Sequence, residues 1–141
     1  MNKICITDRK NVECSPRICA DRPSKSIYRG DIFLVDFKKN EGSEQSGIRP
    51  ALILQNDVGN CFSPTTIVCP LSSRNKFYDT THVKLSPEDC GILVESNVLC
   101  EQIRVIDKSR LIKRVGRIIS SEKLADIDRK TKILLGWGAQ K

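Results

Sequence analysis

The stretch Gly42-Ser43-Glu44-Gln45-Ser46-Gly47-Ile48-Arg49-Pro50 separates two apolar runs, Asp31 to Phe37 and Ala51 to Leu54. Both runs are typical of buried strands, and a glycine near each end of the polar stretch lets the chain bend between them. Pro50 restricts the residue before it to extended backbone, so the backbone of Arg49 is set where the second strand begins. The stretch therefore predicts two strands joined by a loop that carries a charged candidate site.

The chain after residue 27 predicts further short strands, separated by Gly, Asn, Asp, Ser and Pro. These runs are Thr66–Leu71, His82–Leu85, Ser96–Gln102 and Ile112–Ile118. Residues 56–60 have the composition of a turn, and one helical turn is expected to open at Pro87. Short strands at this spacing favour an antiparallel barrel or sandwich. We place one domain at residues 27–138, after a flexible N-terminal extension at residues 1–26 that shows no strand or helix period.

The last element is predicted to be a helix that begins at Ser120 or Ser121 and ends near Gly136. One face is expected to pack on the sheet, and it consists of Leu124, Ile127, Thr131, Leu134 and Leu135. The opposite face carries cations that we expect to be solvated, namely Lys123, Arg129, Lys130 and Lys132. The sequence thus predicts a mainly β domain with one C-terminal helix.

The chain has 141 residues and a formal net charge of +7, and a chain of this length supports one domain with a buried core. No apolar run approaches the roughly 20 residues needed to cross a bilayer, and the first residues are too polar for a secretory signal. We therefore expect a cytoplasmic protein without a membrane partner. Residues 104–141 carry eleven basic and four acidic side chains, which favours a polyanion or an acidic protein as partner. A solvated basic helix face explains part of this excess equally well.

Metal, cofactor and cysteine chemistry receive little support. The seven cysteines are expected to be reduced in the cytoplasm and to act as small hydrophobic residues. Cys14 and Cys19 lack a second pair or a nearby histidine, so we predict no metal site. His82 is the single histidine and is expected to be a structural strand residue. Because no phosphate-binding glycine loop is present, we predict no cofactor.

A guanidinium (Arg49), a carboxylate (Glu44) and the hydroxyls of Ser72 and Ser73 remain as candidate reactive groups. They suit metal-free chemistry at a phosphodiester, which requires positive charge on the phosphorus oxygens and proton transfer at the attacking and leaving oxygens. A guanidinium has the planar shape that matches phosphate oxygens. An arginine and a glutamate in one loop more often form a surface ion pair, so these residues alone leave both interpretations open.

Five stretches follow one another in a specific order: Tyr28-Arg29-Gly30-Asp31-Ile32, Gly42 to Asp57, Phe62 to Val68, Thr81-His82-Val83 and Glu101 to Lys108. Together they resemble the MazF/PemK family of toxin endoribonucleases over about residues 28–136. The resemblance implies an SH3-like antiparallel β-barrel (CcdB/PemK-like) with a C-terminal helix, and a homodimer. It also implies sequence-specific, metal-independent cleavage of single-stranded RNA to 2′,3′-cyclic phosphate and 5′-hydroxyl ends. The implied partner is a cognate antitoxin with an acidic tail, through which alone the complex would bind operator DNA.

The resemblance also assigns roles by position. Arg49 matches the catalytic arginine of the family, and Ser72 falls where relatives usually have a threonine that holds the scissile phosphate. Glu44 matches a carboxylate near the active site. Because a guanidinium keeps its proton at neutral pH, we assign Arg49 as phosphate clamp and acid and Glu44 as candidate base, while the identity of the base stays open. The residues Cys69-Pro70 depart from the family pattern, so the local strand path stays open too.

RNA contact is expected mainly from the loop after Ser72. Bases stack on aromatic rings with about 1–3 kcal/mol each, although Phe77 could equally anchor this loop to the core. The predicted RNA-binding residues are Lys38, Lys39, Gln45, Ser73, Arg74, Lys76, Phe77 and Tyr78.

Two alternatives from other classes remain. The pair Trp137-Gly138 resembles the C-terminal Trp-Gly of CcdB-type toxins, which are non-enzymatic gyrase poisons with this barrel. The other alternative is a catalytically inactive binding module.

Overall fold

The computed structural model describes residues 26–39, 41–42, 44–74 and 77–137. The predicted N-terminal extension lies outside the described residues, except for Ser26, and so do Cys14 and Cys19. The strands are β1 (Asp31–Asp36), β2 (Ile48–Ile53), β3 (Thr65–Ser72), β4 (His82–Leu85), β5 (Ser96–Leu99), β6 (Arg104–Asp107) and β7 (Leu111–Arg117). The helices are α3 (Asp57–Phe62), α4 (Pro87–Cys90) and α5 (Ser121–Leu134).

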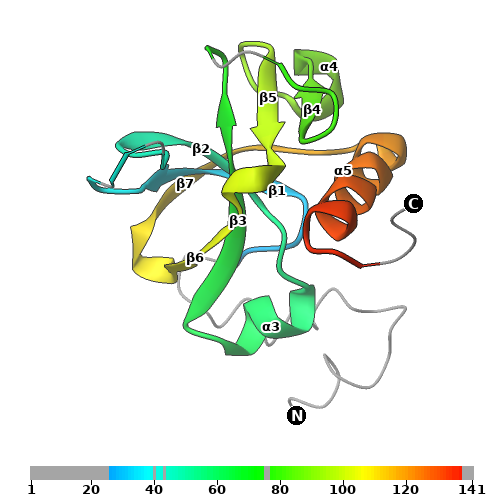
Figure 1. Cartoon of the computed structure of the whole chain (residues 1–141). Coiled ribbons are helices and arrows are strands. Elements are labelled where there is room, and N and C mark those ends of the chain that lie inside the picture. The colour runs from blue at the N-terminus through cyan, green and yellow to red at the C-terminus, as the bar shows by residue number, and fades with distance from the viewer. Residues whose placement is uncertain (1–25, 40, 43, 75–76, 138–141) are drawn as a thin grey trace.

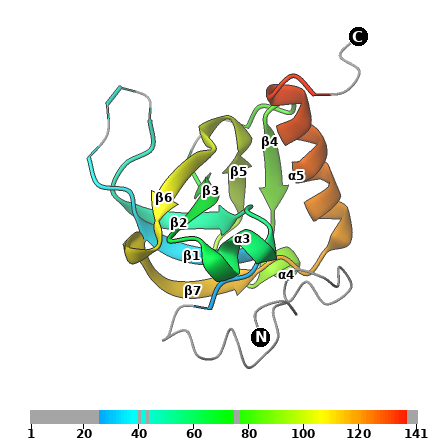
Figure 2. The ribbon, with the colours of Figure 1, turned by 90° about the horizontal axis from the view of Figure 1, so that it is seen from below.

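All the strand pairs in the described part of the chain are antiparallel, in the order β4-β5-β3-β2-β1-β7, with β6 paired to β3. The long strand β3 has three partners in this sheet. Its first part pairs with β6, its middle part pairs with β2, and its end pairs with β5. Figures 1 and 2 show α5 along one side of this curved sheet, next to β4, while the β1–β2 hairpin projects on the other side. The fold is the predicted antiparallel one with a C-terminal helix.

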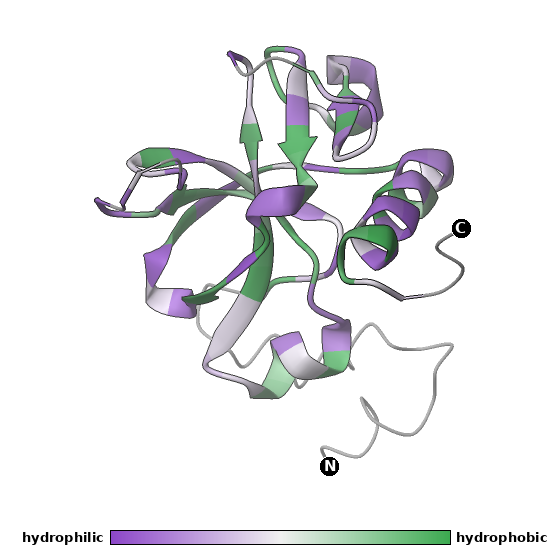
Figure 3. Ribbon diagram, viewed as in Figure 1, coloured by the Kyte–Doolittle hydropathy of each residue, from purple (hydrophilic) through white to green (hydrophobic). Residues whose placement is uncertain are grey.

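Two hydrophobic clusters cover opposite faces of β1, β2 and β3. Ile32 of β1 lies opposite Leu52 in the first cluster, and the next residue, Phe33, lies opposite Ala51 in the second. Successive side chains of a strand point to opposite faces, so stretches that are covered on both faces, such as residues 32–33 and 51–53, are apolar at successive positions rather than at alternate ones. Figure 3 shows hydrophobic colour along parts of the central strands.

Strand β3 passes straight through Cys69 and Pro70, which answers the question about the strand path. Cys69 lies opposite Leu52 of β2 in the buried core. On the other side of β3, the partner changes from β6 at Val68 to β5 at Leu71. Proline has no N–H to donate to a neighbouring strand, and Pro70 stands where β3 changes that neighbour.

Two elements differ from the sequence prediction. Residues predicted as a turn form the short helix α3, which begins after Asn56, whose side chain accepts a hydrogen bond from the backbone of Gly59 at 2.8 Å. A helix of six residues that contains a glycine shows no clear helical pattern in the sequence. The predicted strand Ser96–Gln102 ends at Leu99, where a 3₁₀ turn leads into β6, a four-residue strand that was not predicted.

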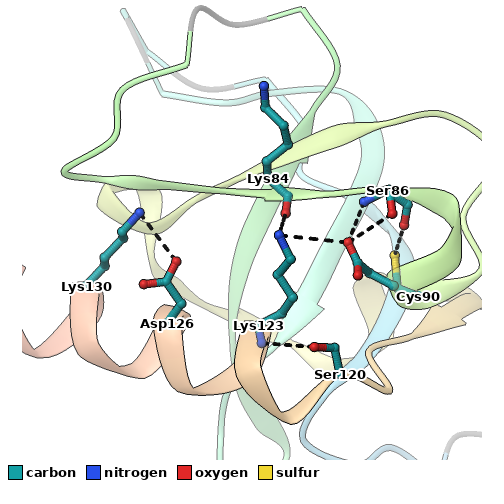
Figure 4. A network of polar contacts seen from close by, with 8 residues as sticks. Lys84, Ser86, Cys90, Ser120, Lys123, Asp126 and Lys130 are labelled. Carbon is teal, nitrogen blue, oxygen red and sulfur yellow. Dashed lines mark hydrogen bonds and ion pairs between the residues drawn. The ribbon is translucent and has the colours of Figure 1, made fainter.

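Helix α5 confirms the predicted start, because the hydroxyl of Ser120 accepts a hydrogen bond from the backbone N–H of Lys123. The prediction that Lys130 is solvated was wrong: the residue is 6% exposed. Lys130 stands three positions after the fully buried Ile127 and therefore on the same helix face. Its Nζ donates to the carbonyl oxygen of His82 at 2.8 Å, and Figure 4 shows it pointing from α5 toward the strands. Conversely, Leu134 and Leu135 are exposed.

Candidate active-site groove

The β1–β2 hairpin is closed at its base by two backbone hydrogen bonds. The N–H of Phe37 donates to the carbonyl of Gly47 at 2.9 Å, and the N–H of Gly47 donates to the carbonyl of Lys38 at 2.8 Å. Gly47 has φ +79° and Gly42 has φ +57°, which is backbone that favours glycine. The two glycines therefore bend the loop as the sequence predicted.

Arg49 lies in β2, opposite Val35 of β1, and is partly exposed. Its Nε donates to the carbonyl oxygen of Ser46 at 3.1 Å, which ties the side chain to its own hairpin. Among the described residues, no carboxylate lies within ion-pair distance of Arg49. The surface ion pair with Glu44, which the sequence had left open, is therefore not formed.

Ser72 ends β3, where its backbone pairs with Asn97 of β5. The residue is only 6% exposed, and its Oγ accepts a hydrogen bond from the backbone N–H of Arg74 at 3.2 Å. The hydroxyl is thereby held at a fixed place at the end of a core strand.

These residues meet in a groove of about 990 Å³. Its lining comes from the β1–β2 hairpin, the end of β3, the segment after α4, and β7: Leu34, Gly42, Glu44, Gln45, Ser46, Arg49, Pro50, Leu71, Ser72, Ser73, Arg74, Gly91, Ile92, Leu93, Val94, Ser96, Lys113, Arg114 and Val115. The described lining holds four cations and one carboxylate, Glu44. The groove therefore has the charge to bind an anion, and it unites Arg49, Ser72 and Glu44.

The predicted RNA-binding residues are divided between the groove and other places. Gln45, Ser73 and Arg74 line the groove. Lys38 and Lys39 lie near the base of the hairpin and are not part of the lining, and Lys38 pairs with Asp36 at 3.7 Å. Lys76 lies outside the described residues.

Phe77 and Tyr78 lie away from the groove, against the ring of His82. The ring centroids are 6.2 Å apart for Phe77 and 5.4 Å apart for Tyr78. The ammonium group of Lys84 lies 4.9 Å from the centroid of the Phe77 ring. These contacts hold the Phe77 ring against β4, and its role in RNA binding stays a prediction.

His82 is buried, and both its ring nitrogens have partners. Nδ1 accepts a hydrogen bond from the backbone N–H of Tyr78 at 3.1 Å, so the ring proton lies on Nε2, which faces Oε2 of Glu101 at 3.0 Å. This arrangement suits the structural role that the sequence predicted for His82.

Sequence reasoning missed several groove residues. Lys113 and Arg114 reach the groove because β7 pairs with β1, which brings the basic C-terminal third beside the hairpin. The charge excess of that third was the available signal. Leu93 and Val94 add apolar surface to the groove, and Leu93 is 94% exposed.

The four cysteines among the described residues are buried and form no disulfide with one another. A hydrogen bond to Cys100, and then burial, raise the pKa of Cys69 well above its usual value, and the same bond lowers the pKa of Cys100. Burial raises the pKa of Cys90. No cysteine is part of the described groove lining, so the thiols serve the core rather than the groove.

Known structures share this fold. MazF from Deinococcus radiodurans is 30% identical, with 78% of this chain and 96% of that chain covered and a TM-score of 0.68. A MazE-MazF complex from the same organism contains a chain that is 27% identical, with coverage of 82% and 100% and a TM-score of 0.67. A mycobacterial endoribonuclease in complex with its cognate antitoxin is 20% identical, with coverage of 80% and 96% and a TM-score of 0.62.

The sequence itself matches the family described as PemK-like, MazF-like toxin of type II toxin-antitoxin system over residues 28–135. The chain therefore belongs to the PemK/MazF toxin family, as the motifs predicted. It is a MazF-like toxin whose distant relatives include endoribonucleases paired with antitoxins. Within the described part of the chain, no helix has the length and hydrophobicity to cross a membrane.

Proposed function

We propose that this protein is a toxin that cleaves single-stranded RNA endonucleolytically, in a sequence-specific and metal-independent way. The observation that carries the proposal is the position of Arg49 in a cationic groove, with no described carboxylate near enough to neutralise it. A guanidinium without an ion-pair partner among the described residues, held at the edge of a rigid strand, is suited to bind a phosphate. Ser72 and Glu44 line the same groove.

The reaction requires that the ribose 2′-oxygen attack the adjacent phosphorus while the bond from phosphorus to the 5′-oxygen breaks. In our assignment Glu44 takes the 2′-hydroxyl proton, Arg49 binds the non-bridging oxygens, and the leaving 5′-oxygen receives a proton from Arg49 or from water. The Ser72 hydroxyl donates to a phosphate oxygen. The products are a 2′,3′-cyclic phosphate and a 5′-hydroxyl.

The remaining groove residues suit an RNA strand. Arg74, Lys113 and Arg114 supply positive charge along the lining, which attracts the phosphate backbone. Gln45 and Ser73 add hydrogen-bonding groups between these cations.

We further propose that the toxin domain, residues 27–138, acts as a homodimer in the cytoplasm. Exposed apolar side chains at the groove rim and at the end of α5, Leu93, Val94, Ile133, Leu135 and Trp137, support a protein interface. An antitoxin with an acidic tail is the proposed inhibitor, because relatives are crystallised with antitoxins and such a tail complements a cationic groove. Operator DNA would bind only through that complex.

The test is cleavage of single-stranded RNA in EDTA by the wild type and by Arg49→Ala. Loss of one preorganised group that stabilises the transition state costs about 10²–10³ in kcat, and we expect a loss of at least this size. Arg129→Ala is the matched control, because Arg129 lies on α5 outside the groove lining and its ion pair in the described part of the chain is with Asp126. It should keep wild-type activity.

The other outcomes of this experiment would refute the assigned site or support a different class of protein. Equal cleavage by wild type and Arg49→Ala would refute the assigned site. Absence of cleavage together with inhibition of gyrase would support the CcdB-like poison, and RNA binding without cleavage or gyrase inhibition would support an inactive binding module. Mapping the 5′ ends of the fragments would identify the cleaved sequence.

A further inference from the structure

A second, smaller hollow of about 410 Å³ continues the groove across β7. The two hollows share Gly91, Arg114 and Val115, so Arg114 stands between them. The second hollow ends at Arg117 and Ile119. A polymer that lies in the groove therefore finds a continuous depression along the strand.

Two guanidinium groups in the second hollow are anchored on one buried carboxylate. Asp31 is 0% exposed, and its Oδ1 lies 2.5 Å from Nη1 of Arg117 and 3.7 Å from Nη1 of Arg114. Its Oδ2 accepts a hydrogen bond from the backbone N–H of Tyr28 at 2.9 Å. The side chains of Arg114 and Arg117 remain 57% and 49% exposed. One carboxylate thus orients two guanidiniums and leaves a net positive charge facing solvent, at a lower entropic cost for binding than two free side chains.

The backbone around Gly116 forms the wall of this hollow. A Cβ on Gly116 would lie 2.6 Å from the carbonyl oxygen of Cys90, so only glycine allows β7 to pass this close to the end of α4. The thiol of Cys90 stays neutral because burial raises its pKa. The described lining of the second hollow contains no carboxylate, and its surface therefore favours an anion.

We infer that the second hollow is a backbone subsite for RNA, in which Arg114 and Arg117 bind a phosphate that flanks the scissile one. The inference rests on the proposed function, because it extends the same RNA strand from the groove across β7. Arginine forks match phosphate oxygens, and the hollow is continuous with the groove that holds Arg49. Only an RNA long enough to reach past Arg114 gains this contact.

The experiment compares the binding of short and long RNA by fluorescence anisotropy. The probes are mixed-sequence 2′-O-methyl oligoribonucleotides of about 4 and about 16 nucleotides, which lack the 2′-hydroxyl needed for cleavage. In Arg114→Gln, the ratio of long to short affinity should fall by about three- to tenfold, and the salt slope for the long probe should decrease by about 0.7. Arg114→Lys should restore part of the ratio, because it keeps the charge.

Two variants serve as controls. Arg114→Gln leaves Asp31 paired with Arg117, and thermal unfolding should confirm that the fold is retained. Arg129→Gln removes an equal charge from α5 and should keep the wild-type ratio. Arg49→Ala, in the groove that both probes occupy, should weaken both probes alike.

The outcomes separate this inference from the proposed function. An unchanged ratio in Arg114→Gln would overturn the subsite, while cleavage that depends on Arg49 would still support the enzyme. Weaker binding of poly-glutamate with unchanged RNA affinity would assign the hollow to an acidic protein partner and would also overturn the inference. A wild type that binds neither RNA probe would contradict both.

Discussion

The protein carries two groups of charged residues that differ in how they are used. One is the groove, with Arg49, Arg74, Lys113 and Arg114. The other, which we term the buried cluster, centres on the buried His82 and Lys130 on the side of α5 and includes their more exposed neighbours Tyr78, Glu101 and Asp126. In the buried cluster, Lys130 bonds the His82 carbonyl at 2.8 Å and lies 3.5 Å from Asp126, and His82 contacts Glu101 at 3.0 Å.

The contrast separates structural charges from charges available to a ligand. Burying a charge is costly unless hydrogen bonds and opposite charges compensate it, and the cluster supplies both. Among the described residues, the side chain of Arg49 makes a single hydrogen bond, to a backbone carbonyl, and the side chain of Lys113 makes no hydrogen bond or ion pair. Their charges contribute little to the fold, so we expect the groove to determine activity and the cluster to determine stability.

The largest expected effect is on catalysis, from Glu44→Gln. If Glu44 is the general base, the substitution should lower kcat by about 10²–10⁴, the usual range for loss of a general acid or base. The pH-rate profile should also lose its ascending limb. Folding should be unaffected, because Glu44 is exposed and the one hydrogen bond of its carboxylate to the described residues comes from the backbone N–H of Glu41, at 3.4 Å.

Glu41→Gln is the matched control, since Glu41 lies in the same exposed hairpin but outside the groove lining. It should change neither kcat nor the profile. A Glu44→Gln enzyme that keeps the ascending limb would show that another group is the base. Arg49 would then be the remaining candidate of the pair.

The next prediction compares the free energy of unfolding after one substitution in each region. Lys130→Met keeps most of the apolar stem but leaves the His82 carbonyl without its donor, and a buried polar group that loses its partner costs about 1–3 kcal/mol. We expect a decrease of this size in the free energy of unfolding, measured by urea denaturation. Lys113→Met should change it by less than about 0.5 kcal/mol.

RNA affinity should show the opposite order. Lys113→Met removes a groove cation and should weaken RNA binding by about threefold, whereas Lys130→Met should bind RNA like the wild type wherever it is folded. Equal stability losses in the two variants would remove the distinction between the regions.

Sequence patterns predicted the central strands well because hydrophobic clusters cover both faces of these strands. Residues 32–33 of β1 and 51–53 of β2 are covered by one or the other of the two clusters at successive positions, and this produces continuous apolar runs. Helix α3 escaped prediction because it has only six residues and contains Gly59, which has a low helix propensity. The prediction placed Lys130 on the solvent face because it assigned charged residues to that face. A lysine on the core face is recognisable only once the His82 carbonyl is known to lie opposite it.

The groove was predictable only where neighbours in sequence form it. Glu44 and Arg49 belong to one hairpin, so the local pattern placed them together, and the family resemblance added Ser72. Lys113 and Arg114 depend on the pairing of β7 with β1, which joins residues far apart in the chain. The position of Phe77 beside His82 likewise depends on packing that no local pattern reveals.

The smallest expected effect concerns Asp89 of α4, a charged residue that we expect to serve the fold rather than a ligand. Oδ2 of Asp89 accepts hydrogen bonds from the N–H and hydroxyl of Ser86 at 2.8 and 3.0 Å, and Lys123 lies 4.0 Å away. Figure 4 shows Lys123 reaching from α5 to the carbonyl of Lys84 beside this turn. The backbone hydrogen bond from Ser86, more than the other contacts, lowers the pKa of Asp89 in the folded protein.

A folded pKa below the unfolded one means that the ionised carboxylate stabilises the fold. This contribution is fully present above the unfolded pKa of about 3.9 and is lost as the pH falls through the folded pKa. Asp89→Asn should therefore lower the free energy of unfolding by less than about 1 kcal/mol at pH 7, with the difference vanishing at strongly acidic pH. Glu88→Gln, in the same helical turn, is the control for removing a charge. The urea midpoints of Asp89→Asn and the wild type should therefore differ more at pH 7 than at acidic pH. An equal difference at both pH values would mean that the ionised form of Asp89 does not stabilise the fold.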